Sequence, residues 1–307
     1  MDRYEEMTGI MEDTGTIILL AAVLAGTVLV RLLMQRTEKT DFYSGLSIQT
    51  ETEEEGMLPD LGVCQTTGTC ELQSDCVQVS GTRAGVMAAM ADGIGRANTG
   101  KVSAQIAVDT VLDRYEPYQV LNHPEYFFRT AFQEANLRIQ KTIGERRGGA
   151  SLGAVYLSGT AACYALAGDI RIALLRGEEL IPVSQGHTVD VLAAASYREG
   201  KLSRREALWS QEEKRVWNYL GMDGFRQVEM GEIPIRLKTG DVLLMASRGI
   251  WQEVPSGDLE DFLLAGGSLQ EKAERIVRAA EESGSPQREN GSILLVRAEV
   301  TDETEQF

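Results

Sequence analysis

The stretch VMAAMADGIG, residues 86–95, decides how the fold is interpreted. Its apolar run ends in Asp92-Gly93, and a helical pattern begins shortly after Gly95. We predict a buried strand over residues 86–91 that carries a carboxylate to its tip, where glycines let ligand or backbone approach closely. An Asp beside a Gly at a strand end can bind a hard cation. Alternatively, Asp92 caps the following helix, and the stretch taken alone favours this simpler interpretation.

The composition narrows the possible functions. The chain has 307 residues, enough for one large or two small domains. Its formal net charge of -16 argues against a nucleic-acid partner, because phosphate binding requires a basic face. With only two histidines, a zinc site of the HExxH type is excluded. The four cysteines lack C-x-x-C spacing, so we expect reduced thiols. Any catalysis must therefore rely on carboxylates.

An N-terminal segment is predicted to cross the membrane. Residues 14–30 carry no charge, and the apolar pattern continues to residue 34, which gives about 20 residues of span. Residues 1–13 are acidic, unlike the basic start of a signal peptide, and would form a short extracytoplasmic N-terminus. Arg31, Arg36 and Lys39 follow the segment, so the positive-inside rule places the rest of the chain in the cytoplasm. We expect a single-pass cell-membrane protein with a transmembrane helix over residues 14–34; a buried core helix would rarely be so uniformly apolar.

The remaining chain divides into a linker, a domain and a tail. Residues 35–60 are polar and acidic and predict a flexible linker. Residues 61–300 form the predicted domain, and residues 301–307 a C-terminal tail. Strands are expected at 61–64, 76–79, 86–91, 152–158, 161–167, 170–176, 180–183, 233–237, 242–246 and 293–300, and helices at 101–115, from 124 to about 143, around 211–220 and at 269–282. Consecutive hairpins favour an α+β sandwich of mostly antiparallel sheets.

Acidic residues recur where the predicted strands begin or end. They are Asp75, Asp92, Asp169 and Glu289. Singly, each could be a turn or capping residue. Together they suit a hard-cation site, in which oxygen ligands from distant segments meet at one edge of a sheet.

These motifs resemble the metal-dependent protein phosphatase family, also called PPM or protein phosphatase 2C. The stretch at 86–95 resembles the family's VADGMGG signature. Further matches follow in the family's order: QSD at 73–75, GGAS at 148–151, ALAGDIRIALLRGEEL at 165–180, LKTGDVLLMASRGIW at 237–251 and SPQRENGSILLV at 285–296. The resemblance covers residues 61–300 and implies a four-layer α-β-β-α sandwich, with two mostly antiparallel sheets flanked by helix pairs.

The resemblance also implies a function. Family members hydrolyse phosphoserine or phosphothreonine with two magnesium or manganese ions. Carried over by motif, Asp92 is the catalytic residue that bridges the ions, and Gly93 offers its carbonyl. Asp75 reaches one ion through water, and Asp169 belongs to a weaker third position. Glu289 is the remaining metal ligand, and a phosphoprotein substrate or a Ser/Thr kinase is the implied partner.

The chain departs from the family at ligand positions. Arg248 stands where the family has a metal-ligating Asp, and Glu289 replaces a second Asp. Ser74 replaces the family's Glu, and Cys70 aligns with its phosphate-gripping Arg. Two unit charges about 5 Å apart interact by roughly 3 kcal/mol at an effective dielectric of 20, so turning attraction into repulsion costs about double. That corresponds to several decades of metal affinity.

Three hypotheses remain open. The first is a membrane-anchored, cytoplasmic Ser/Thr phosphatase that uses two divalent metals. The second is a pseudophosphatase, a binding or regulatory module whose metal site Arg248 disables; Arg248 would pair with Asp92 or Glu289 and fill the space of a cation. The third is a scaffold of an envelope assembly. The presence of Arg248 at an expected ligand position is the feature that distinguishes the pseudophosphatase hypothesis from the phosphatase hypothesis.

Overall fold

A computed structural model describes residues 46–50, 60–96, 98–210 and 215–298 of the chain. The chain divides into two compact units, residues 1–45 and 46–307, and all described residues belong to the second. The predicted N-terminus, transmembrane helix and C-terminal tail lie outside the described residues. Within the described ranges, no helix is both long and apolar enough to cross a membrane.

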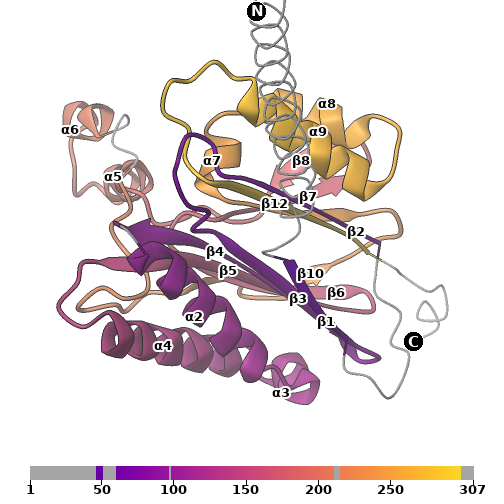
Figure 1. The fold of residues 1–307 in the computed structure, drawn as a ribbon, viewed down its shortest axis with the longest axis horizontal. Helices are drawn as coiled ribbons and strands as arrows, with labels where there is room; N and C mark the ends of the chain where they lie inside the picture. The colour runs from indigo at the N-terminus through magenta and orange to yellow at the C-terminus, as the bar shows by residue number, and fades with distance from the viewer. Residues whose placement is uncertain (1–45, 51–59, 97, 211–214, 299–307) are drawn as a thin grey trace, which may run out of the picture. The chain divides into compact units, whose positions relative to one another are not determined.

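Two sheets form the centre of the described unit (Figure 1). The first contains, in spatial order, β1 (Leu46–Thr50), β3 (Cys76–Thr82), β4 (Gly85–Gly95), β5 (Gly148–Ser158), β6 (Ala161–Ala167) and β10 (Ile235–Arg236), with β9 (Glu229–Met230) also paired to β6. The second contains β2 (Leu61–Thr66), β12 (Gly291–Arg297), β11 (Val242–Ala246), β7 (Arg171–Arg176) and β8 (Glu179–Pro182). Every pair is antiparallel except β1 with β3.

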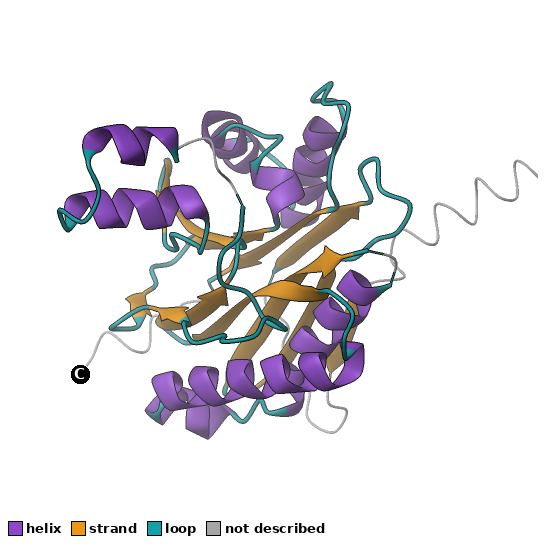
Figure 2. Cartoon of the chain, turned by 90° about the vertical axis from the view of Figure 1, so that its left-hand side faces the viewer, coloured by secondary structure: helices purple, strands orange, loops and turns teal. Residues whose placement is uncertain are grey.

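Helices cover the outer face of each sheet. The first sheet carries α2 (Thr99–Asp113), α3 (Pro117–Asn122) and α4 (Pro124–Ile143), and the second carries α7 (Arg248–Trp251), α8 (Ser256–Leu264) and α9 (Leu269–Glu281). Figure 2 shows the sheets between these helices, while α5 (Val189–Arg198) and α6 (Arg204–Trp209) belong to neither helical layer. The predicted α+β class with two mostly antiparallel sheets is confirmed.

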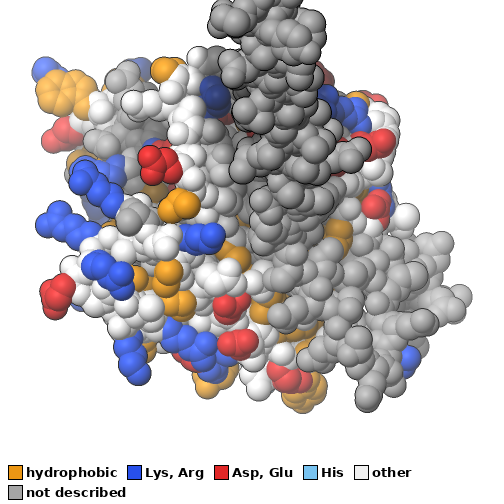
Figure 3. Space-filling view, viewed as in Figure 1, with side chains coloured by type: hydrophobic (Ala, Val, Ile, Leu, Met, Phe, Trp, Pro, Cys, Tyr) orange, Lys and Arg blue, Asp and Glu red, His pale blue; other side chains and the backbone are white. Residues whose placement is uncertain are grey.

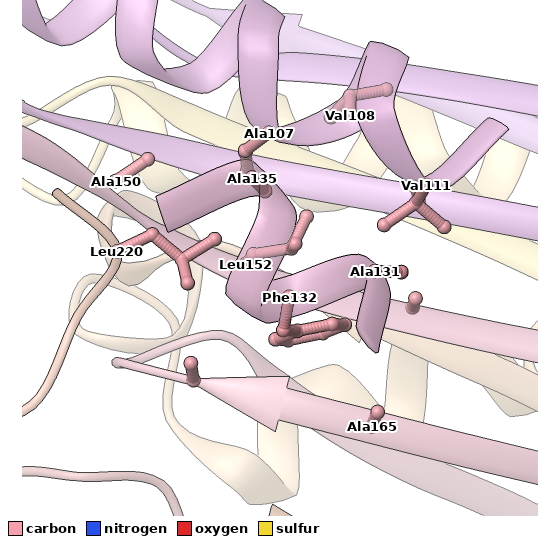
Figure 4. Close-up of a cluster of buried hydrophobic side chains, with 14 of the residues drawn as sticks. Ala107, Val108, Val111, Ala131, Phe132, Ala135, Ala150, Leu152, Ala165 and Leu220 are labelled. Atoms are coloured by element: carbon pink, nitrogen blue, oxygen red, sulfur yellow. The ribbon is translucent and has the colours of Figure 1, made fainter. Parts of the chain in front are cut away.

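Three apolar cores hold the layers together. One lies between α2, α4 and the first sheet, one between the sheets, and one beneath α9. Apolar residues recur at helical spacing along α4 and form a buried stripe: Phe128, Phe132 and Ile139 are fully buried. Phe132 stands edge-on to Phe128 and lies in the first core together with Leu152 of β5 and Leu220 (Figure 4). Burying a large aromatic side chain in this way contributes about 3 kcal/mol.

The key strand is longer than predicted. β4 continues past Asp92 to Gly95 and pairs with β5 throughout, so Asp92 lies opposite Ser151 inside the ladder rather than at the strand tip. The glycines explain the extension. A Cβ at Gly93 would lie 2.5 Å from the backbone of Gly100 in α2, so only glycine permits this close packing of strand and helix. The interpretation of Asp92 as a helix cap is therefore wrong.

The helix predicted around 211–220 is wrong where the chain is described. Residues 215–220 are not helical; Val216 bridges to Thr188, and Leu220 bridges to Ala150. Leu220 is fully buried, so its packing overrides the local helical pattern. The sequence pattern also missed the short helices α3, α5, α6, α7 and α8. Only residues 46–50 and Asp60 of the predicted linker are described. Residues 46–50 form β1, a strand that the acidic composition of the linker did not predict.

Candidate functional site

A cleft of about 440 Å³ opens where β4 approaches the starts of α7 and β12. It brings together Asp92 and Gly93 from the first sheet with Arg248 and Glu289 from the second. Cys70 lies in its wall. Segments far apart in sequence thus meet here, and of the four acidic residues predicted to converge, Asp92 and Glu289 line the cleft. Asp75 lies just before β3, and Asp169 lies between β6 and β7. Neither residue lines this cleft.

Asp92 lies partly buried at the cleft. Burial raises its pKa well above the usual value, and repulsion from Asp75 and Glu289 raises it further. The positive charge of Arg248 opposes this rise. Among the described residues, no side chain forms a hydrogen bond or an ion pair with the Asp92 carboxylate. The carboxylate is therefore poorly compensated and would gain from a nearby cation.

Asp75 joins the two sheets. Only 7% of the residue is exposed, and its Oδ2 accepts hydrogen bonds of 2.7 Å from the hydroxyls of Ser247 and Ser292. Its Oδ1 has no partner in the described part of the chain. Burial raises the pKa of Asp75 to about 6, although the two serine hydrogen bonds oppose the rise. Because Ser247 immediately precedes Arg248, Asp75 fixes the start of α7.

The two substituted positions contact each other. Arg248 Nε lies 3.3 Å from Glu289 Oε2 and 3.3 Å from Gln252 Oε1. Gly249 permits this approach, since a Cβ there would lie 2.2 Å from the carbonyl oxygen of Asn290. The Asn290 side chain accepts a 2.8 Å hydrogen bond from the backbone of Ser74, which anchors the loop that carries Glu289. Of the two predicted partners for Arg248, the structure pairs it with Glu289.

Asp169 occupies a separate, fully buried position before β7. One oxygen lies 3.5 Å from an Nη of Arg171, too far for a hydrogen bond, and neither oxygen has a hydrogen-bond partner among the described residues. Burial raises its pKa to about 7 and outweighs the opposing charges of Arg171 and Arg248. The Arg171 guanidinium stacks 4.4 Å above the ring of Trp251, whose indole N–H donates to the Asp169 carbonyl.

Sequence reasoning missed His187 beside this aspartate. His187 Nδ1 accepts a 3.1 Å hydrogen bond from the backbone N–H of Gly168 and lies 3.0 Å from the side-chain nitrogen of Asn218. Burial lowers the pKa of His187 to about 4. The ring is thus neutral at physiological pH and holds the loop before α5 against Gly168. No motif signalled it, because its partners are backbone groups and a distant amide.

The described residues do not fit a pair of divalent ions. No group of three or more His, Cys, Asp or Glu side chains could hold a metal among the residues that the structure describes. Arg248 and Glu289, at the two positions where the resemblance implies metal ligands, form an ion pair. The remaining donors are the Asp92 carboxylate, the Gly93 carbonyl and the unpartnered Oδ1 of Asp75.

Comparison with known proteins points to one family. No protein-family model matches the chain. The serine/threonine phosphatase stp of Listeria welshimeri is 28% identical over 214 residues, which cover 67% of this chain and 82% of that protein. Protein phosphatase PhpP of Streptococcus pneumoniae is 26% identical over 235 residues, 74% of this chain and 91% of that protein. The chain is similar to PPM-type Ser/Thr phosphatases.

Solved structures of phosphatases share the fold of this chain. A serine/threonine phosphatase of S. agalactiae superposes with a TM-score of 0.69 at 19% identity, over 78% of this chain and 99% of that one. A PPM Ser-Thr phosphatase of Mycobacterium smegmatis superposes with a TM-score of 0.62 at 21% identity, over 78% and 98%. The catalytic domain of PstP, solved in complex with 2 manganese ions, gives a TM-score of 0.59 at 20% identity, over 77% and 96%.

Proposed function

We propose that this protein is a membrane-anchored pseudophosphatase that binds phosphoserine or phosphothreonine proteins with little or no hydrolysis. The ion pair between Arg248 and Glu289 carries the proposal. A guanidinium here repels a second cation beside Asp92 instead of binding it. The fold is similar to that of PPM phosphatases, while the charge of Arg248 would oppose a two-metal arrangement.

Arg248 is suited to bind a phosphate group. Its contacts with Glu289 and Gln252 both use Nε, and its terminal Nη groups have no partner among the described residues. A guanidinium fork matches two phosphate oxygens, and such charge-assisted hydrogen bonds are the strong ones. The side chain lines the cleft and is 24% exposed, so a phosphorylated side chain could reach it.

A second candidate is a phosphatase that uses magnesium or manganese. Two observations favour it: Asp92 lacks a compensating partner, and Asp75 Oδ1 is buried and unpartnered. A single cation held between these oxygens and the Gly93 carbonyl would relieve both, since hard cations take oxygen ligands. The manganese complex of PstP belongs to a structural neighbour and supports this candidate only by analogy.

We further infer that residues 14–34 anchor the chain in the cell membrane and that the domain is cytoplasmic. The apolar span and the basic residues that follow it support this inference. The anchor would bring the cleft close to phosphoproteins or Ser/Thr kinases at the membrane.

Phosphate release from a phosphothreonine peptide tests the proposal. The full chain, in neutral detergent with manganese, is compared with Arg248→Asp and Asp92→Ala. We expect the native protein to bind the peptide and to release no more phosphate than Asp92→Ala, and Arg248→Asp to gain release. Arg236→Asp makes the same charge change on an exposed residue of β10 and serves as the matched control. Release by the native protein that Asp92→Ala abolishes would overturn the pseudophosphatase.

A further inference from the structure

We propose that three exposed basic side chains beside the cleft select an acidic sequence next to the phosphorylated residue of the partner. We call Arg96, Lys101 and Arg147 the basic rim. The inference rests on the proposed function, because it assigns the chemistry of the partner segment that lies next to the phosphate in the same cleft.

The ends of two strands place the arginines side by side. The last pair of the β4–β5 ladder joins Gly95, which lines the cleft, to Gly148. Arg96 and Arg147 are the next residues beyond this pair. The hydroxyl of Thr99 donates to the carbonyls of both, at 2.7 Å and 3.4 Å. One hydroxyl thus links the two backbones at the edge of the cleft.

The side chains of the basic rim have no ion-pair or hydrogen-bond partners within the described part of the protein. Arg96, Lys101 and Arg147 are exposed, and none of their side chains forms an ion pair or hydrogen bond with a described residue. On the neighbouring helices, by contrast, Arg114 and Arg138 both pair with Glu134. Unpaired cations at a cleft mouth are unexpected in a chain of net charge -16. They would attract a negatively charged partner to this face.

The position of Lys101 strengthens this interpretation. It lies in the first turn of α2, which contains no acidic residue and whose cap, Asn98, makes no side-chain hydrogen bond. The N-terminal end of a helix is positive, so a cation there is unfavourable for the helix itself and favourable for a bound anion. Figure 3 shows Lys and Arg side chains gathered on the left of the visible face, where Figure 1 places the end of β4 and the start of α2.

Strand geometry sets the spacing of the partner's charges. Arg96 follows Asp92 by four residues, which corresponds to about 13 Å along an extended strand. An extended peptide covers the same length with about four residues. Arg248 lines the same cleft as Asp92 and is close enough to oppose the rise in its pKa. A partner whose phosphorylated residue lies between these two residues would therefore present Asp or Glu about three to five positions away to the basic rim.

Four peptides test the proposal by fluorescence anisotropy on the full chain in neutral detergent. They carry either threonine or phosphothreonine, and either three glutamates or three glutamines at the third to fifth positions after it. We expect the glutamates to tighten binding of the phosphopeptide about tenfold, because each exposed charge pair contributes a factor of about two to five. The preference should vanish in high salt, which screens exposed charges.

Variants test whether the preference for the glutamate-containing phosphopeptide depends on the basic rim. Arg96→Glu with Arg147→Glu should abolish or reverse it, and Arg96→Gln with Arg147→Gln, which changes the size of the side chains less, should abolish it. The control pair, Arg236→Glu with Lys238→Glu, makes the same charge change on exposed residues before β11 and should retain it. A preference that survives both rim double variants would overturn the proposal.

Two other outcomes are distinguishable. If phosphorylation gives no gain in affinity and Arg248→Asp changes nothing, the proposed function fails, while a rim-dependent effect of the glutamates would still support the basic rim. If the rim variants leave peptide binding unchanged but weaken binding to micelles that contain phosphatidylserine, the rim contacts lipid and the proposal is wrong.

Discussion

The buried carboxylates of the interior and the charged residues at the mouth of the cleft differ in how their charges are compensated. Asp75 and Asp169 lie in the protein interior, outside the lining of the cleft, and both are buried with oxygens that lack partners among the described residues. At the mouth, Arg248 and Glu289 form an ion pair whose glutamate is 51% exposed. The buried carboxylates therefore lack compensation among the described residues, whereas the charges of Arg248 and Glu289 compensate each other. The comparison teaches that charge in this part of the protein is balanced at the solvent-exposed mouth of the cleft and not in the interior.

The largest effect expected on folding stability concerns the buried Asp169. The pKa of Asp169 is about 7 in the folded protein and lies above its ordinary value of 3.8, so folding favours the protonated form. This contribution to stability is complete below pH 4 and is lost as the pH rises through 7, by up to about 4 kcal/mol. We expect Asp169→Asn, which stays neutral, to be about as stable as the native protein at pH 4 and clearly more stable at pH 8.

Urea unfolding of residues 46–307 between pH 4 and 8, in the presence of a chelator, measures this difference. The conservative control is Asp169→Glu, which keeps the charge and should show no stabilisation at pH 8. If the free energies of unfolding of the native protein and of Asp169→Asn depend on pH in the same way, burial does not raise the pKa of this aspartate.

A smaller effect is expected at the mouth. Glu289→Gln removes the ionic partner of Arg248, but exposed ion pairs contribute at most about 1 kcal/mol to folding. The change should therefore leave the free energy of unfolding almost unaltered. It should also free the guanidinium and strengthen phosphopeptide binding about two- to fivefold, because a competing carboxylate is gone. Gln252→Ala, which removes the neutral neighbour, is the control. Weaker phosphopeptide binding by Glu289→Gln would show that Glu289 positions Arg248 for the ligand.

Much of the fold could be predicted from the sequence. The apolar patterns located β6 and β11, and the stripe on α4 indicated its buried face. The length of β4 could not be predicted, because it depends on the contact between Gly93 and α2 rather than on a local pattern. The extended course of residues 215–220 likewise follows from the burial of Leu220, a tertiary effect.

The sequence predicted part of the cleft lining but not the arrangement of the side chains. Motif order predicted that Asp92, Arg248 and Glu289 would meet, and they line one cleft. Spacing could not show that Asp75 would bind two serine hydroxyls across the sheets, or that Arg248 would choose Glu289 over Asp92. The roles of the carboxylates as metal ligands remain predictions. The basic rim could not be predicted because Arg96 and Arg147 are far apart in sequence and are brought together by the pairing of β4 with β5 and by the Thr99 hydroxyl.

Calorimetric titration of residues 46–307 with manganese tests the central claim most directly. The claim is that Arg248 prevents binding of two ions. Replacing Arg248 by Asp removes its repulsion of the second ion and adds an attraction. The binding free energy of that ion should improve by about 6 kcal/mol, which corresponds to roughly ten-thousandfold in affinity. We predict that the native protein binds no second ion at millimolar manganese and that Arg248→Asp binds two. Two ions bound by the native protein at micromolar concentrations would contradict the account.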